Sequence, residues 1–295
     1  MPKRLEIWAD SFHEGRWVAT EIGKRFSNAP VTYERGFIPV FNIASGDRSL
    51  TIKVYGDYEA WSPKPSAIAE ILQYGKPDFM LFAADEGRVL FIGEETAAVP
   101  TGNQSTQRCE RVVGACLQRP PVAFAYLLPE YGLHLDGQPR RASVWPAMLA
   151  AKLSDQYTTT SLVLLFGDRE HLEDYSVGEG VGLMFDLVTT HVKEYMGLPA
   201  ADWAQAREST VAKARQLMLE FVRDQAPSML KVLPGYCTNG SGLDWPPARQ
   251  VSDPSAFVAS NLIRYDAFLA AVYESVQTHK AYTLVTGSGS KPKGE

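Results

Sequence analysis

The sequence predicts an α/β protein in which a mixed central sheet is flanked by helices and followed by an additional helical C-terminal part. Between residues 67 and 167, short apolar segments of strand length alternate with segments of helical periodicity. Several of the short segments are apolar throughout, and such strands are typical of sheets that are covered on both faces. Beyond residue 180, longer segments carry apolar residues at helical spacing. The alternation therefore predicts the covered sheet, and the later segments predict the helical part.

The composition is that of an ordinary globular protein. The chain has 295 residues, of which 45% are hydrophobic and 21% charged, and this length is sufficient for a substantial core. The formal net charge of −5 at pH 7 provides no general attraction for phosphate. Any surface that binds nucleic acid must therefore be a local patch.

The N-terminus and the cysteines indicate where the protein resides. The first residues lack the uncharged apolar segment of a signal peptide, and no apolar run is long enough to span a membrane. The three cysteines, Cys109, Cys116 and Cys237, cannot form a complete set of disulfides, and the first two lie on an apolar helical face. We therefore expect a cytoplasmic protein without membrane contact, in which Cys109 and Cys116 are buried and reduced.

The first 48 residues contain short apolar segments separated by charged or glycine-containing breaks. We interpret these segments as strands, with one helix among them, in an N-terminal extension or small subdomain. Residues 49–55 are typical of a β-strand. A break rich in Pro and Ser at residues 62–66 then precedes a short helix over residues 67–74, whose apolar residues share one side.

Residues 77–96 predict a β-hairpin. Two runs rich in aromatic and β-branched residues, 79–84 and 88–93, flank an acidic turn that contains Gly87. Because side chains alternate along a strand, the even-numbered and odd-numbered residues of the second strand are expected on opposite faces. The first set is Leu90, Ile92, Glu94 and Thr96, and the second set is Val89, Phe91, Gly93 and Glu95.

Two acidic residues stand at the open end of this hairpin. Asp78 precedes the first strand, and Glu94 lies at the end of the second. The two carboxylates are therefore expected at neighbouring strand ends, close to an apolar core. Burying one unpaired carboxylate is costly, and burying two is more so. A divalent cation with oxygen ligands is the usual solution, so the pair predicts a cation site.

The rest of the chain supplies the remaining elements of the prediction. They are a helix at 105–117, a strand at 121–128, a helix at 145–153, a strand at 161–166, and helices at 181–195, 208–224 and 256–277. Residues 234–254, rich in Gly, Pro, Asn and Ser, are expected as a long loop. We expect residues 201–286 to form a helical part packed on a core at residues 49–200, followed by a flexible tail at 287–295.

Pro77-Asp78 and Glu94-Glu95-Thr96 resemble the motif of the PD-(D/E)XK nuclease superfamily, to which most restriction endonucleases belong. In that family a strand that begins with Pro-Asp is followed by a strand that ends in acid-X-Lys, and the two acids hold Mg²⁺. The order of elements over residues 67–167 is also similar to that of the family core through its fourth strand. The resemblance implies a restriction-endonuclease-like core at residues 49–200 and a Mg²⁺-dependent, sequence-specific endonuclease that cuts double-stranded DNA.

The resemblance also assigns roles to individual residues. Asp78 and Glu94 would ligate Mg²⁺, and Thr96 takes the place of the family's lysine. Threonine can form a hydrogen bond with the attacking water but cannot supply the positive charge of lysine. Gln104 or Gln107 is therefore expected to help to orient that water.

Two further acids have two interpretations each. Many relatives carry an acid on the helix before the Pro-Asp strand, and Glu70 is the matching residue here. Glu70 is therefore either a third metal ligand or a solvated helix glutamate. Glu95 is expected to point away from Glu94, and it becomes the alternative ligand if the strand is irregular.

Polar and basic residues after the hairpin are candidates for contacts with DNA. Gln104, Arg108 and Arg111 lie around the start of the next helix, whose free N–H groups also attract an anion. A solvated first turn explains the same residues equally well. Arg140 and Arg141 in a later polar loop are further candidates for contacts with the DNA backbone. Because relatives that cut palindromes act as dimers, we expect a homodimer by analogy.

Other chemistries fit the sequence less well. The five histidines are scattered without a zinc-binding spacing, and the chain contains no nucleophile-elbow or phosphate-loop motif. A glycosidase could use the same carboxylate pair, but the tryptophans that would bind sugar lie mostly far from the hairpin in sequence. Two alternatives stay open: a catalytically inactive DNA-binding or scaffold protein on a nuclease fold, and a repair or junction nuclease of the same fold.

Overall fold

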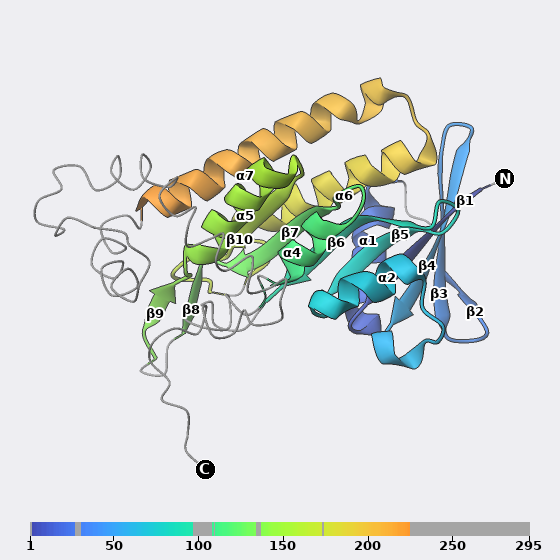
Figure 1. The fold of residues 1–295 in the computed structure, drawn as a ribbon, viewed down its shortest axis with the longest axis horizontal. Coiled ribbons are helices and arrows are strands. Elements are labelled where there is room, and N and C mark those ends of the chain that lie inside the picture. Colours follow the sequence, from blue (N-terminus) through green and yellow to red (C-terminus); the bar gives the residue numbers. More distant parts are fainter. Residues whose placement is uncertain are drawn as a thin grey trace, which may run out of the picture.

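The computed structural model describes residues 2–26, 31–96, 108, 110–133, 137–172 and 174–224. Within these residues, a mixed eight-stranded sheet forms the centre of the protein and is flanked by helices (Figure 1). The predicted α/β architecture with a mixed, covered sheet is therefore confirmed. Among the described residues, no helix combines the length and the apolar character needed to cross a membrane.

The strands of the large sheet are β1 (Lys3–Ala9), β2 (Val31–Glu34), β3 (Ile38–Ser45), β4 (Arg48–Gly56), β5 (Phe79–Ala83), β6 (Arg88–Glu95), β7 (Ala123–Pro129) and β10 (Ser161–Phe166). Their order across the sheet is β10-β7-β6-β5-β1-β4-β3-β2. Strands β10, β7 and β6 run parallel to one another, as do β1 and β4, and the other neighbours are antiparallel. Two short strands, β8 (Tyr131–Leu133) and β9 (Pro139–Arg141), form a separate antiparallel pair.

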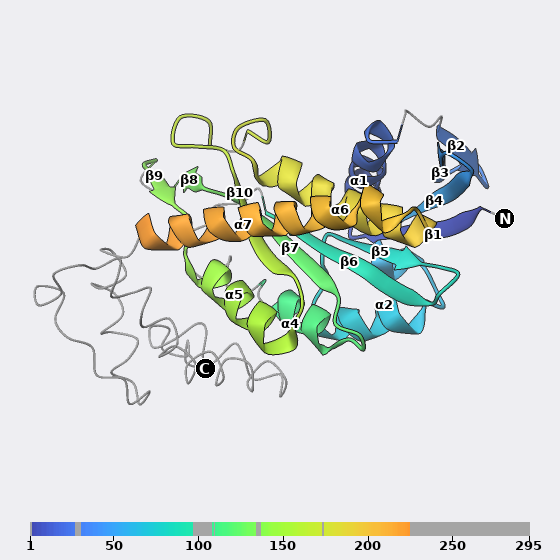
Figure 2. The same cartoon turned by 90° about the horizontal axis from the view of Figure 1, so that it is seen from above.

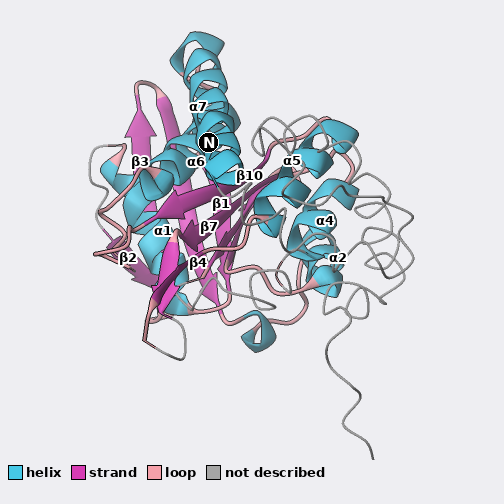
Figure 3. Cartoon of the chain, turned by 90° about the vertical axis from the view of Figure 1, so that its left-hand side faces the viewer, coloured by secondary structure: helices cyan, strands magenta, loops and turns pink. Residues whose placement is uncertain are grey.

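The helices are α1 (Phe12–Lys24), α2 (Ser66–Ile71), α4 (Glu110–Leu117), α5 (Trp145–Tyr157), α6 (Gly180–Met196) and α7 (Ala204–Asp224). Helices α1 and α6 cover one face of the sheet, and α2, α4 and α5 cover the other (Figures 2 and 3). Helix α7 packs along the β10 edge and contacts both α6 and α5. The sheet therefore has a core on each face, as its apolar strands predict.

The N-terminal residues are part of the same sheet. Strand β1 lies between β5 and β4, and β2 and β3 extend the sheet beyond β4. Leu5 and Ile7 of β1 are completely buried on the α1/α6 side, whereas Trp8 packs on the other side. The segment 1–48, which the sequence suggested as an extension or small subdomain, contains β1, β2 and β3, that is, one interior strand and two outer strands of the large sheet.

The hairpin of β5 and β6 contains a bulge. Leu81 lies opposite Phe91, but the next residue, Phe82, lies opposite Val89, so Leu90 is extra. Leu90 therefore joins Phe91 in the α1/α6 core, whereas Val89 joins Ile92 in the other core. The expected alternation of faces is wrong at Val89 and Leu90 and holds for Phe91 and Ile92.

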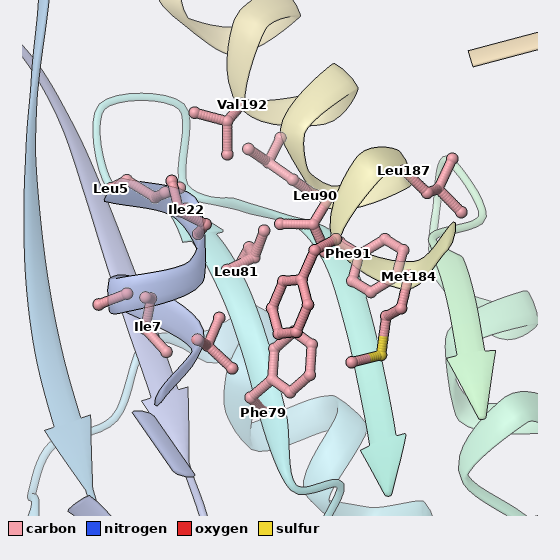
Figure 4. Packing of buried hydrophobic residues seen from close by; sticks show 14 of the residues in the cluster. Leu5, Ile7, Ile22, Phe79, Leu81, Leu90, Phe91, Met184, Leu187 and Val192 are labelled. Atoms are coloured by element: carbon pink, nitrogen blue, oxygen red, sulfur yellow. The ribbon is translucent and has the colours of Figure 1, made fainter. Parts of the chain in front are cut away.

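The α1/α6 core is built around stacked aromatic rings. Phe79 and Phe91 have ring centroids 6.0 Å apart and an interplanar angle of 23°, and Met184 of α6 lies beside them (Figure 4). Gly93 leaves the space that the Phe79 ring fills, because a Cβ atom at that position would collide with the ring. The hairpin thereby packs against α6 directly beside its acidic end, because Phe79 follows Asp78 and Gly93 precedes Glu94.

Two glycines at the start of α6 provide a test of how closely this helix packs on β10. A methyl group at Gly180 would collide with the backbone oxygen of Leu165 in β10, whereas one at Gly182 would meet open space. We expect Gly180→Ala to lower the free energy of unfolding by roughly 2 kcal/mol, because backbone cannot yield as a side chain can. Gly182→Ala is expected to raise it by up to about 1 kcal/mol through better helix propensity. Urea unfolding of both variants measures the difference, and equal effects would contradict the described contact.

Candidate functional site

The register of the hairpin brings Asp78 and Glu94 to the same edge of the sheet. Phe79 lies opposite Gly93, so the next positions along the two strands are Asp78 and Glu94. Met80 and Ile92, two residues further in, both belong to the core under α2, α4 and α5, and Asp78 and Glu94 therefore share that face. Both acids are buried, with 9% of Asp78 and none of Glu94 exposed.

Tyr58 fixes the backbone of Asp78 to the end of β1. The buried Tyr58 hydroxyl donates to the oxygen of Pro77 at 2.7 Å and reaches the oxygen of Trp8 at 3.2 Å. The N–H of Asp10 also donates to the oxygen of Asp78 at 3.0 Å. Burial, followed by the negative charge of Asp78, raises the pKa of Tyr58 well above its usual range. The hydroxyl therefore stays protonated and remains a donor.

The carboxyl group of Asp78 accepts a short hydrogen bond from the backbone N–H of Glu95. Burial raises the pKa of Asp78 from 3.8 to about 7, and the charge of Glu14 adds to the rise. The hydrogen bond from Glu95 and the charges of Arg108 and Arg111 act in the opposite direction. Asp78 is therefore a carboxyl group that exchanges its proton near neutral pH, which is typical of functional sites.

Glu94 is neutralised by two arginines. Its Oε1 accepts from Arg108 Nη1 at 2.8 Å and from Arg111 Nη1, and Arg108 Nη1 also donates to the backbone oxygen of Glu95 at 2.6 Å. Glu94 Oε2 is buried and has no hydrogen-bond partner within the described parts of the chain. Burial lowers the pKa of Arg111, opposed first by the charge of Asp78. The arginines that the sequence assigned to a phosphate therefore bind a carboxylate in this structure.

Thr96 and Glu95, the other two residues of the predicted motif at the end of β6, contact other parts of the protein. Thr96 is buried, and its N–H donates to the oxygen of Leu127 in β7 at 3.1 Å. The side chain of Glu95 accepts from the Tyr175 hydroxyl at 2.7 Å, and Tyr175 stacks on Phe166 of the α1/α6 core. Glu95 thus points away from Glu94, as expected. The irregularity of β6 lies at Leu90 rather than at Glu95.

The other candidate residues that the structure describes do not form a common site with Asp78 and Glu94. Glu70 is exposed on α2, and the described residues contain no group of three His, Cys, Asp or Glu side chains arranged to hold a metal ion. Arg140 is exposed on β9, and Arg141 pairs with Glu130 at 2.6 Å and with Asp224 at 3.3 Å. Arg141 therefore ties the strand pair β8–β9 to α7. Gln104 and Gln107, like Cys109 and Cys237, lie outside the described residues, whereas Cys116 is buried as a free thiol.

The sequence pattern does not single out the residues at the β1 end of the site. Asp10 precedes α1 and Glu14 lies in its first turn, and both contribute to the electrostatic environment of Tyr58. Glu14 forms a capping box with Ser11, which the pattern Ser11-Phe12-His13-Glu14 indicates. The sequence does not indicate that β1 pairs with β5, and only this pairing brings Asp10 beside Asp78.

The chemistry of the two acids suits a divalent cation. One buried oxygen of Glu94 lacks a hydrogen-bond partner within the described part of the chain, and the pKa of about 7 leaves Asp78 partly protonated at neutral pH, with a proton that a cation would displace. Both donors are carboxylate oxygens, the ligands that Mg²⁺ prefers. Comparisons of the chain with protein-family models, with curated proteins and with solved structures each gave no match.

The raised pKa of Asp78 predicts a pH-dependent stability. The folded state binds the proton more tightly than the unfolded state, so this group stabilises the fold fully below pH 4, and that contribution is lost as pH rises through about 7. Asp78→Asn removes the titration. Without divalent ions, we expect the free energy of unfolding of the variant to rise relative to that of wild type as the pH increases from 4 to 8, by a few kcal/mol in total. Thermal or urea unfolding across this pH range tests the expectation, and Asp47→Asn, at an exposed site, is the control. A stability difference between Asp78→Asn and wild type that does not change with pH would contradict it.

The buried ion pair of Glu94 predicts a strong coupling with Arg111. Arg111→Met leaves the fully buried carboxylate with one arginine, and we expect a loss of roughly 3 kcal/mol in the free energy of unfolding. Adding Glu94→Gln removes the charge and should restore most of that loss. Arg48→Met, at an exposed pair with Asp47, should change stability by less than about 0.5 kcal/mol. A double-mutant cycle in urea measures the coupling, and purely additive losses would refute it.

Proposed function

We propose that this protein is a Mg²⁺-dependent endonuclease that cuts double-stranded DNA at specific sites, with a core of the PD-(D/E)XK type. The observation that supports this proposal is the pairing of Asp78 with Glu94 at one sheet edge, where one oxygen of Glu94 is buried without a partner within the described residues. Asp78 precedes β5 and Glu94 lies at the end of β6, and helix α4 and the parallel strand β7 follow in the order that the resemblance implies. Hydrolysis of a phosphodiester is the reaction that such a carboxylate pair with Mg²⁺ serves in that family.

In the proposed mechanism, Asp78 and Glu94 hold the cation through their carboxylate oxygens. When bound, the cation lowers the pKa of a water molecule and offsets charge on the phosphate. Tyr58 keeps Asp78 in place, since it binds the backbone oxygen of Pro77. Thr96, at the end of β6, is the residue that would contact the attacking water.

Arg108 and Arg111 have a double role in this proposal. Without the cation they neutralise Glu94, with side chains that are 31% and 18% exposed. When a cation supplies the charge for Glu94, the two guanidinium groups become available for a DNA phosphate, to which guanidinium groups bind well. Arg140, which is exposed, is a further candidate for contacts with the DNA backbone, and Arg141 is bound to Glu130. We further propose a homodimer, because two sites are needed to cut two strands. The proposed location is the cytoplasm.

A second candidate function is a DNA-binding or scaffold protein that has lost its chemistry. The observation that favours it is the pair of arginines on Glu94, together with threonine where the family has lysine. In such a protein the arginines replace the cation permanently, and Mg²⁺ neither binds nor changes stability.

Cleavage of plasmid DNA tests both candidates. With Mg²⁺ we expect discrete fragments, which favour a restriction enzyme over a repair nuclease that gives sequence-independent smears. Asp78→Ala and Glu94→Ala should each lose cleavage by several orders of magnitude and still bind DNA, whereas Asp47→Ala, in an exposed turn, should cut like wild type. A fully active Asp78→Ala protein would contradict the assignment. Binding without cleavage by wild type would favour the scaffold.

A further inference from the structure

We propose that Asp10 is a third oxygen ligand of the cation site of Asp78 and Glu94. The inference extends the cation site of the proposed function, but it concerns ion binding and does not depend on which bond is cut. Asp10 belongs to neither part of the nuclease-like motif. It comes to the site through β1, the N-terminal strand.

The strand register places three acids in one row. Ala9 of β1 lies opposite Phe79 of β5, and Phe79 lies opposite Gly93 of β6. One position further toward the sheet edge, the row is Asp10, Asp78 and Glu94. The hydrogen bond from Asp10 N–H to the Asp78 oxygen, at 3.0 Å, continues the pairing of β1 and β5 past the last strand residues. Neighbouring strands are about 4.8 Å apart, and directly opposite residues share a face.

Alternation along β1 and β5 places Asp10 and Asp78 on the same side of the sheet, because Trp8 and Met80, each two residues away, both belong to the core under α2, α4 and α5. The charge of Asp10 helps to raise the pKa of Tyr58, which lies in the core under α2. It also partly offsets the effect of burial, which lowers the pKa of Arg111 on α4. Asp78 acts on the same two groups. Tyr58 also contacts the oxygens of both Trp8 and Pro77, so one side chain holds the strand ends that carry Asp10 and Asp78.

Asp10 is also available as a ligand. It is exposed, and its carboxylate makes no hydrogen bond or ion pair in the described portion of the protein. The other nearby acids have structural tasks: Glu14 accepts from the N–H of Ser11 at 2.9 Å, and Glu95 accepts from Tyr175. An exposed carboxylate would contact an ion from its solvent side and leave other positions for water and phosphate, as Mg²⁺ requires.

The independent sign of a ligand is the oxygen of Glu94. Glu94 is completely buried, yet its Oε2 lacks a hydrogen-bond partner among the described residues, a costly state for a carboxylate. The three carboxylates do not converge on one point in this arrangement, in which Arg108 and Arg111 hold the other oxygen of Glu94. Ion binding therefore requires the arginines to leave and the carboxylates to rotate, and the exposed Asp10 can do so at little cost.

Binding of Mn²⁺ to the full chain without DNA tests the inference. The binding is measured by calorimetry and by the loss of the electron paramagnetic resonance signal of free Mn²⁺. Loss of a supporting residue around a metal typically weakens affinity 10–100-fold, so we expect Asp10→Asn to weaken binding by about tenfold or more. Asp78→Asn and Glu94→Gln should weaken it at least as much. Asp10→Glu should keep part of the affinity, and Asp47→Asn, at an exposed turn, should bind like wild type. Thermal unfolding in chelator checks that each variant is folded.

The outcomes separate this inference from the proposed function. If Asp10→Asn binds Mn²⁺ like wild type while Asp78→Asn does not, Asp10 is no ligand and the two-acid site stands. If wild type binds no Mn²⁺, the inference is overturned together with the cation site. If all three acids are needed for binding but wild type cuts no DNA, the three-acid site is supported and the nuclease proposal fails.

Discussion

The structure around the candidate site depends on keeping the carboxylate of Glu94 out of water. Glu94 is fully buried at the end of β6, and a buried charge is tolerated only with close counter-charges. Arg108 and Arg111 supply them and thereby hold the first turn of α4 against the sheet edge. The same two arginines also act on Asp78, where their charges partly offset the rise in pKa that burial causes.

Local patterns in the sequence were enough to predict the layered α/β fold and the hairpin. Fully apolar runs predicted strands β7 and β10 with nearly correct bounds, and the turn at Gly87 predicted the β5–β6 hairpin. The separation of Glu94 and Glu95 onto opposite faces also followed from alternation, since the bulge lies earlier in the strand at Leu90. A bulge has no reliable local signal when every residue of a strand is apolar, because each residue then fits either face.

The residues around the acids could not be predicted in the same way. Strand β1 reaches β5 across more than sixty residues of sequence, and such pairing leaves no trace in the spacing of either segment. Asp10 therefore looked like one more polar residue after an apolar run. The arginines were identified correctly as basic groups near the site, but their partner depends on which side chain is buried beside them. A guanidinium group binds carboxylate and phosphate with the same geometry, so sequence could not distinguish them.

The place of β1 in the sheet also determines how the protein can be divided. A fragment that starts at residue 49 would contain the hairpin, α4, β7 and β10, but β4 and β5 would each lose the neighbour that joins them. Two unpaired backbone edges would then face each other across an empty position, a state prone to aggregation. During synthesis on the ribosome, β1 can pair with β4 only after α1, β2 and β3 have emerged, and with β5 only after that. The N-terminal strand thus links the earliest and the later parts of the chain, and expression of the motif-bearing segment by itself requires that this strand be supplied.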